Sequence, residues 1–400
     1  MGIPKIRFKG YTEDWEQRKL GDLAEIVGGG TPSTSKEEYW DGEIDWYAPA
    51  EIAGQIYVDS SERKITEDGY NNSSAKMLPV GTVLFTSRAG IGKVAILRKE
   101  ACTNQGFQSI VPRDNELDSY FIFSRSEELK KYGETVGAGS TFVEVSGKQM
   151  ANMDIMMPTT LYEQKQIGEY FEKIDHLITL HQRKCEETKK LKKYMLQKMF
   201  PQNGQSVPQI RFAGFTEDWE QRKFSELYAK SSEKNDGSIG MDRNITVATM
   251  QFKEDVKVST AEYLKTYYTF NLGDIAFEGH QSKEFRYGRF VENDIGNGIV
   301  SHIFAVFRPI KEFDLQFWKY AINNEMLMQR ILSRSTKAST MMHDLVTEDF
   351  LNETFLVPPL DEQKKIGAYL KNLDHLITLH QRKCDELQNI KKYMLQNMFV

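Results

Sequence analysis

The chain has 400 residues, of which 40% are hydrophobic and 27% charged, and a formal net charge of −5 at pH 7; this length predicts two or three domains, each able to bury a core. The acidic balance argues against a protein that binds nucleic acid unaided, because neutralising phosphates requires lysine and arginine. The absence of a long apolar run, of a signal-peptide core and of a disulfide framework among Cys102, Cys185 and Cys384 favours a cytoplasmic protein with no membrane contact.

A short segment occurs twice, at residues 4–20 and 208–224, and its two copies are identical at 13 of 17 positions. In the first copy Thr12 precedes two acidic residues, which is typical of a helix start. We expect Trp15 and Trp219, one in each copy, to lie in hydrophobic cores rather than to take part in chemistry.

Each copy is followed by a body of mixed composition. The first body, 21–158, has the β-branched and aromatic content of a strand at 80–86, a glycine-rich loop at 87–93 and a returning strand at 94–97. A helix at 120–131 and a flexible loop at 137–141 follow. The second body repeats this outline with different residues: a strand at 272–277, a loop at 278–289, a strand at 300–308, a helix at 315–332 and a loop at 335–340. We predict an α+β fold for each body, with a mixed or antiparallel sheet.

Two long stretches, 163–200 and 362–399, agree at 26 of 38 positions. Their apolar residues alternate at spacings of four and three, which predicts helices with a coiled-coil seam. Each helix should span roughly 57 Å, and an antiparallel pair of them would join two pseudo-symmetric bodies. The predicted seam residues are Ile167, Phe171, Ile174, Ile178, His181, Cys185, Ile366, Leu370, Leu373, Ile377, His380 and Cys384.

The seam contains His181, Cys185, His380 and Cys384, two pairs with a spacing of four. Four such ligands could bind zinc, but cysteine also behaves as a small hydrophobic residue. We interpret them as a layer of the seam and predict no metal site.

The loops that follow the central strands are candidate polyanion contacts. A Walker A loop is excluded at 87–93, because it needs glycine at Ser87 and serine or threonine at Val94. We interpret Ser87, Arg88 and Lys93 as polyanion contacts, with a plain hairpin turn as the alternative. Residues 278–289 carry glutamine and arginine, which contact base edges, and lysine, which contacts phosphates; a solvated surface loop is the alternative there.

No residues have the spacing of a catalytic set. The chain has no glycine fingerprint of a dinucleotide site, no methylase motif of Asn or Asp before two prolines and an aromatic, and no HExxH zinc motif. This favours a binding protein over an enzyme.

The whole chain resembles the specificity subunits of type I restriction–modification enzymes. The resemblance rests on the run from Pro358 to Gln363 that opens the second long stretch, its degenerate copy at 158–164, the strands led by Gly81 and Gly273, the repeated tryptophan segments and the duplicated helices. No single motif is diagnostic, but the order of all of them, twice, is specific. The first copy departs from the pattern, with Thr159 in place of the second proline.

The resemblance implies four parts: a target recognition domain at 1–158, a spacer helix at 159–203, a second recognition domain at 204–357 and a second spacer helix at 358–400. Each recognition domain would bind one half of a bipartite, asymmetric double-stranded DNA site. The helices would fix the half-site spacing and dock two methyltransferase (M) subunits that methylate adenine. Restriction (R) subunits would join in the full complex, and S-adenosylmethionine, ATP and Mg would be bound by these partners rather than by this non-catalytic chain.

Carried onto this sequence, the resemblance places the DNA-binding positions in the strand-end loops. They are Ser87, Arg88, Lys93, Ser140, Thr141, His280, Gln281, Lys283, Arg286, Ser335, Thr336 and Lys337.

Two other functions remain open from the sequence. One is a coiled-coil scaffold protein whose bodies bind proteins or small ligands, and an adjacent adenine methyltransferase gene would argue against it. The other is a stand-alone nuclease, for which cleavage of DNA with metal alone would be the sign.

Overall fold

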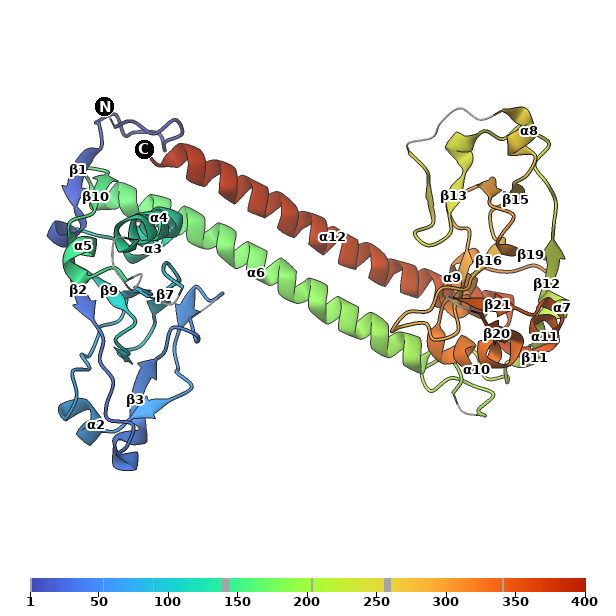
Figure 1. The fold of residues 1–400 in the computed structure, drawn as a ribbon, viewed down its shortest axis with the longest axis horizontal. Helices are drawn as coiled ribbons and strands as arrows, with labels where there is room; N and C mark the ends of the chain where they lie inside the picture. The colour runs from blue at the N-terminus through green and yellow to red at the C-terminus, as the bar shows by residue number, and fades with distance from the viewer. Residues whose placement is uncertain are drawn as a thin grey trace. The chain divides into compact units, whose positions relative to one another are not determined.

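The computed structural model describes residues 2–52, 54–88, 90–138, 144–202, 204–254, 260–339 and 342–400. Its contacts divide the chain into two compact units, residues 1–181 with 382–400 and residues 182–381. Each unit contains one mixed body together with part of each of two long helices, α6 (Leu161–Lys198) and α12 (Leu360–Met398) (Figure 1). None of the helices in the described ranges combines the length and the apolar composition needed to cross a membrane.

The first body is built on a five-stranded sheet of order β2-β9-β6-β7-β4 and a three-stranded sheet of order β5-β3-β8. Most neighbours are antiparallel, but β4 and β7 are parallel, as are β3 and β8. The strands are β1 (Glu16–Lys19), β2 (Ala24–Gly28), β3 (Trp40–Tyr47), β4 (Tyr57–Val58), β5 (Lys64–Ile65), β6 (Val83–Phe85), β7 (Val94–Leu97), β8 (Cys102–Thr103), β9 (Gln108–Pro112) and β10 (Asp154–Met157). The helices are α1 (Leu20–Leu23), η1 (Glu37–Tyr39), α2 (Glu67–Asn71), α3 (Ser119–Ser124), α4 (Ser126–Gly137) and α5 (Gly147–Ala151).

The second body is built on a four-stranded antiparallel sheet of order β12-β19-β16-β17, with four separate strand pairs around it. The strands are β11 (Glu220–Lys223), β12 (Tyr228–Ser231), β13 (Ile245–Thr246), β14 (Gln251–Phe252), β15 (Tyr268–Phe270), β16 (Ile275–Glu278), β17 (Arg289–Glu292), β18 (Gly298–Val300), β19 (Ala305–Pro309), β20 (Thr336–Ala338), β21 (His343–Leu345) and β22 (Thr354–Val357). The helices are α7 (Phe224–Leu227), η2 (Met241–Arg243), α8 (Ala261–Leu264), α9 (Leu315–Ile322), α10 (Glu325–Ser335) and α11 (Thr347–Asn352).

Several predicted elements differ in their bounds. Thr12 does not start a helix, because Trp15 pairs with Gly2 and the next four residues form β1 against β10. The helix expected at 315–332 is divided in two, since the side chain of Asn324 accepts from the Met326 amide and caps a new helix, α10. The strand expected at 300–308 is divided by a turn between β18 and β19. Part of the loop expected at 335–340 is strand β20, which forms a hairpin with β21.

The two long helices run antiparallel within each unit. In the first unit, Lys391 of α12 donates to Asp175 of α6 at 2.6 Å, and Asp175 also accepts from Tyr120 of α3 at 2.9 Å. In the second unit, Lys192 of α6 donates to Asp374 of α12 at 2.6 Å, and Tyr320 of α9 donates to the same carboxylate. The predicted α+β class, with two bodies of related design joined by an antiparallel helix pair, is confirmed.

The start of each long helix is held to the preceding repeated segment by an ion pair. Arg7 donates from Nε and Nη2 to the two carboxylate oxygens of Glu163, at 2.7 and 2.9 Å, and Arg211 binds Glu362 in the same bidentate way, at 2.7 and 2.8 Å. The glutamate side chains are only 1% and 0% exposed. Since a buried carboxylate is costly without its partner, the repeated arginine and the repeated glutamate depend on each other.

The next residues of each long helix bind the cap of a short helix in the body. The Gln164 amide oxygen accepts from the backbone N–H of Asp118, which caps α3. Gln363 does the same for Asp314, which caps α9. A Cβ on Gly168 would lie 2.6 Å from the Asp118 carboxylate, so a glycine one turn along α6 permits this close approach.

The end of each long helix enters a core of aromatic rings. Phe399, directly after α12, lies 5.7 Å from Phe171 and 6.2 Å from Trp15 in the first unit. Phe200, just after α6, lies 6.1 Å from Trp219 in the second. Both tryptophans are buried as predicted. The first body is therefore completed by a helix end that is remote from it in sequence, and the second body by the helix end that directly precedes it.

A carboxylate is buried without a hydrogen-bond partner in the second body. Glu292 of β17 is 2% exposed, and neither carboxylate oxygen has a partner among the described residues. Burial raises the pKa of Glu292 well above its usual value, and the charge of Asp294 adds to the effect. The matching position in the first body is apolar: Ile96 pairs with Val83 as Glu292 pairs with Ile275.

Replacing Glu163 by alanine is expected to destabilise the first unit by about 3 kcal/mol, because Arg7 then keeps a buried charge without its partner. The free energy of unfolding, measured with urea, tests this. Glu169→Ala on the same helix is the matched control, since Glu169 is 63% exposed and pairs with an exposed lysine. Equal losses for the two variants would contradict the structural role of the buried pair.

Replacing Glu292 by glutamine is expected to stabilise the protein at high pH. A folded-state pKa above the unfolded value means that stability is fully present below the unfolded pKa and is lost as pH rises through the folded pKa. The wild type should therefore lose stability relative to Glu292→Gln as the pH rises above the ordinary glutamate pKa and through the raised pKa of Glu292, with a Tm difference of at least ~3 °C at pH 8. The exposed Glu312→Gln is the control. Parallel pH profiles for the wild type and Glu292→Gln would show that Glu292 does not titrate in this way.

Candidate nucleic-acid interface

In the first body, a tight turn follows the central strand β6. The buried hydroxyl of Thr86 donates to the Gly90 carbonyl at 2.7 Å and accepts from the Lys93 amide at 2.9 Å. Gly92 has a φ of +94°, and a Cβ there would lie 2.4 Å from the Lys130 side chain of α4. Only glycine fits this position without displacement, so α4 and Thr86 together fix where Arg88 and Lys93 lie.

Three segments meet at this edge of the first body. The Ser87 carbonyl accepts from Val145 at 3.0 Å, and the Ser87 amide donates to Gly106 at 2.8 Å. Arg88 forms an isolated bridge with Glu144. We call residues 86–93, residues 144–145 and the turn at 104–106 the first loop cluster.

The second body brings the corresponding segments together. The Gly279 carbonyl accepts from His343 at 2.8 Å, His280 forms a bridge with Met342, and the Tyr287 ring lies 5.4 Å from the His343 ring. By strand register, Gly279 and His280 occupy the places of Ser87 and Arg88. We call residues 278–289, the β20–β21 hairpin and the turn at 301–304 the second loop cluster.

The loop at 278–289 is ordered by its own contacts, which leave most of its polar side chains exposed. The Ser282 hydroxyl accepts from the Phe285 amide at 3.0 Å, and the Arg286 amide donates to Glu325 at 3.2 Å. Arg289 is occupied by Glu278, at 2.7 Å, and by the Ala248 carbonyl. Side chains exposed to solvent are His280, Gln281, Lys283 and Arg286.

The predicted DNA-binding residues differ in how accessible they are. Arg88, Lys93 and Thr336 are half-buried and Lys337 is exposed. Ser87 is fully buried with a hydroxyl that has no partner among the described residues. Ser335 is also fully buried, and its hydroxyl donates to the Ile331 carbonyl at 2.9 Å. Ser140 and Thr141 lie outside the described residues.

The sequence prediction missed the third segment of each cluster. The turn at 104–106 follows a two-residue strand, β8, and the turn at 301–304 lies inside a stretch predicted as one continuous strand. Gln105 and His302 are exposed there. The polar residues between two short strand-like runs were the signal from which each turn could have been predicted.

The predicted seam residues divide between the bodies and the helix pair. Ile167 and Phe171 belong to the core of the first body, and Ile366, Leu370 and Leu373 to that of the second. Ile174 and Ile178 pack against Leu387 of α12. All of the predicted set are buried except His181, Ile377 and His380, which are half-buried.

The thiols predicted to lie in the seam bind backbone carbonyls. Cys185 donates to Ile377 at 3.8 Å and Cys384 donates to Ile178 at 3.7 Å, so each cysteine links α6 and α12 within its own unit. In the part of the chain that the structure describes, no three or more His, Cys, Asp or Glu side chains converge as metal ligands.

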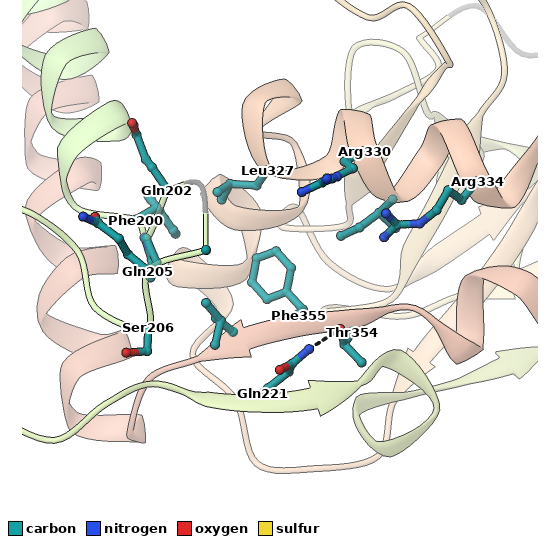
Figure 2. Close-up of a pocket in the computed structure, with 14 residues that line it drawn as sticks. Phe200, Gln202, Gln205, Ser206, Gln221, Leu327, Arg330, Arg334, Thr354 and Phe355 are labelled. Carbon is teal, nitrogen blue, oxygen red and sulfur yellow. Dashed lines mark hydrogen bonds between the residues drawn. The ribbon is translucent and has the colours of Figure 1, made fainter.

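A cavity of about 340 Å³ lies in the second unit, between α10 and the residues that follow α6 (Figure 2). Leu327 and Phe355 give it an apolar wall, Gln221 donates to Thr354 at its edge, and Arg330 and Arg334 line it from α10. Arg334 is paired with Glu353. None of the predicted DNA-binding residues lines this cavity, and its polar groups do not form a nucleophile–base pair.

A sequence profile of the type I restriction modification DNA specificity domain matches residues 12–190 and again residues 216–389. The MjaIX specificity subunit of Methanocaldococcus jannaschii is 38% identical over 169 residues, which are 42% of this chain and 39% of that protein. The EcoR124I/EcoR124II specificity subunit of Escherichia coli is 32% identical over 180 residues, 43% of each chain. The chain thus spans about two fifths of the length of these relatives.

A more distant relative aligns almost end to end. The MjaVIII specificity subunit of M. jannaschii is 22% identical over 399 residues, 96% of this chain and 91% of that protein. Among solved structures, the S subunit of a type I restriction–modification system from M. genitalium has a TM-score of 0.60 at 14% identity, covering 100% of this chain and 99% of that one. This likeness shows a shared fold.

Proposed function

Because the chain belongs to the type I restriction–modification DNA specificity family, we propose that it is the subunit that selects the DNA sequence for a methyltransferase and a restriction enzyme. Each body binds one half of a bipartite DNA site. The observation that carries this proposal is the repeated loop cluster: in both bodies the loop after the central strand meets a second segment, at register-matched positions and with different side chains.

The chemistry of the exposed and half-buried side chains supports base recognition. Arginine can donate two hydrogen bonds to guanine, and glutamine can bind adenine in the same two-point way. Arg88 in the first cluster, and Gln281 and Arg286 in the second, are of these types. Lys93, Lys283 and Lys337 suit phosphate contacts, which position the protein without selecting a sequence. Since the clusters differ in sequence, the half-sites differ and the DNA site is asymmetric.

The exposed faces of the long helices support docking of two copies of one partner. Leu177, Ile390 and Tyr393 are exposed in the first unit, and Leu376, Leu191 and Tyr194 are exposed in the second. These are the same positions of the duplicated helix sequence, Leu177 with Leu376, Leu191 with Ile390 and Tyr194 with Tyr393. Large apolar side chains repeated on a surface are typical of an interface, and their duplication favours two methyltransferase subunits for each chain.

Catalysis and cofactors belong to the partners in this proposal. The methyltransferase subunits bring S-adenosylmethionine and methylate adenine, and restriction subunits bring ATP and Mg. The net charge of −5 fits a chain that binds DNA tightly only inside a complex, where partner surfaces neutralise further phosphates. Three buried free cysteines fit a reducing cytoplasm.

Single substitutions in the loop clusters are expected to act on one half-site each. Arg286→Ala should weaken recognition of the second half-site by about 1–3 kcal/mol and leave the first half-site unchanged, because one base-contacting side chain is lost. Arg88→Ala should do the reverse. The methylated sequence in a host that carries the variant complex, read by methylome sequencing, measures both.

Arg330→Ala controls for the loss of one positive charge, since Arg330 is exposed on α10 and lies outside the cluster. The control should leave the methylated sequence unchanged. A change in both half-sites from Arg286→Ala alone would contradict one-body, one-half recognition.

Charge on the duplicated apolar face is expected to remove one partner at a time. Tyr194→Glu and Tyr393→Glu should each reduce the complex from two methyltransferase subunits to one, and the double variant should bind none, because a carboxylate in an apolar interface stays desolvated and unpaired. Native mass spectrometry of the co-expressed complex gives the stoichiometry. Tyr263→Glu, at an exposed position on α8, should keep two, and two retained subunits in the double variant would reject this docking face.

A further inference from the structure

The turn between β18 and β19 presents a large apolar side chain to solvent. Ile303 is 75% exposed, more than any other large hydrophobic side chain in the described ranges. The turn is closed by a hydrogen bond of 3.1 Å from the Phe304 amide to the Ser301 carbonyl, while Phe307, further along β19, is buried in the core. The closed turn therefore fixes the backbone at Ile303 and leaves its side chain in solvent.

Strand register places Ile303 in the second loop cluster. Strands β16 and β19 pair antiparallel, with Phe277 opposite Ala305. This is the last pair of the two strands: β16 continues into the loop at 278–289, where the Gly279 carbonyl accepts from His343 of the hairpin, and Ile303 lies two residues before Ala305. Ile303 is thus two residues from the end of the pairing at which this loop begins, and the His280 and Gln281 side chains of the loop can hydrogen-bond to base edges.

The first body has the same turn without this side chain. Gly106 lies four residues before Ile110 of β9 as Ile303 lies four residues before Phe307 of β19, and in the first body the Ser87 amide donates to the Gly106 carbonyl. A Cβ on Gly106 would meet the Asn104 side chain at 2.9 Å and Pro49 at 3.0 Å. The exposed residue of that turn is the polar Gln105. The two clusters differ here in kind, polar in the first and apolar in the second.

We propose that Ile303 is a specificity residue that contacts the 5-methyl group of a thymine in the second half-site. This rests on the proposed function. The thymine methyl is the apolar group that base edges present in the major groove, and burying it against Ile303 removes both apolar surfaces from water. The neighbouring hydrogen-bonding side chains orient the base pair, and Ile303 discriminates by this one methyl group.

The experiment uses the complete complex with its methyltransferase subunits and the site found by methylome sequencing. Each thymine of either strand in the second half-site is replaced in turn by deoxyuridine, which lacks only the methyl group, and affinity is measured by competition. The wild type should lose about fourfold at one position, the effect of one buried methyl group. Ile303→Ala should bind thymine and deoxyuridine DNA equally there. Leu272→Ala, also exposed but at the other end of β16, should keep the wild-type discrimination.

Four results would overturn the proposal: a second half-site made only of G·C pairs, a wild-type complex indifferent to every deoxyuridine, discrimination retained in Ile303→Ala, or 2-aminopurine fluorescence showing that Ile303 separates stacked bases instead. Failure of the proposed function looks different, since the wild-type complex would then methylate no bipartite site. If the complex methylates such a site normally and Ile303→Ala leaves its thymine–deoxyuridine discrimination unchanged, only this inference is rejected. The unfolding midpoint of Ile303→Ala should equal that of the wild type, because the side chain is exposed.

Discussion

The buried glutamate at the start of each long helix holds the architecture together. Glu163 and Glu362 each accept two hydrogen bonds from an arginine of the repeated segment, and the following glutamine binds the cap of a short body helix. A charge-assisted two-point bond fixes orientation as well as distance. The helix therefore leaves each body in one defined direction, which the proposed division of one DNA site between two bodies requires.

Beyond these ion pairs, the two units make the same helix contacts but use different residues of the bodies to complete them. The Asp175 and Asp374 networks use the same helix residues, yet the tyrosine that reaches each carboxylate comes from a different position of its body helix: Tyr120 follows its cap by two residues and Tyr320 follows its cap by six. The contact is preserved while the sequence around it has diverged. Variation can thus be carried by the exposed positions of the loop clusters, while side chains such as Thr86 and Ser282 and the glycine at position 92 keep the loops in shape.

The sequence predicted the repeated plan, because periodicity and duplication are local signals. The α+β class, the two long helices and the buried Trp15 and Trp219 all followed from it. It was less informative about the loops, since their shape depends on distant partners. Ser87 and Ser335 look like surface hydroxyls in the sequence but are buried, and the β18–β19 turn lies in a stretch predicted as one continuous strand. Arg7 gave no sign of its role, because its partner lies 156 residues away.

The end of α12 packs into the core of the first body, and this packing has a consequence for folding during synthesis on the ribosome. The core of the first body contains Met398 and Phe171 with Phe399 packed against it, so this body cannot complete its aromatic cluster until the last of these residues has emerged. At roughly 5–20 residues per second, the interval after residue 200 lasts on the order of 10–40 s. During this interval Trp15 and Phe121 lack the Phe399 ring that packs against them in the folded protein. The second body, by contrast, already has Phe200 when its own residues appear. We therefore expect the later-made body to finish folding first, and the earlier one to stay incomplete until the end of α12 has been made.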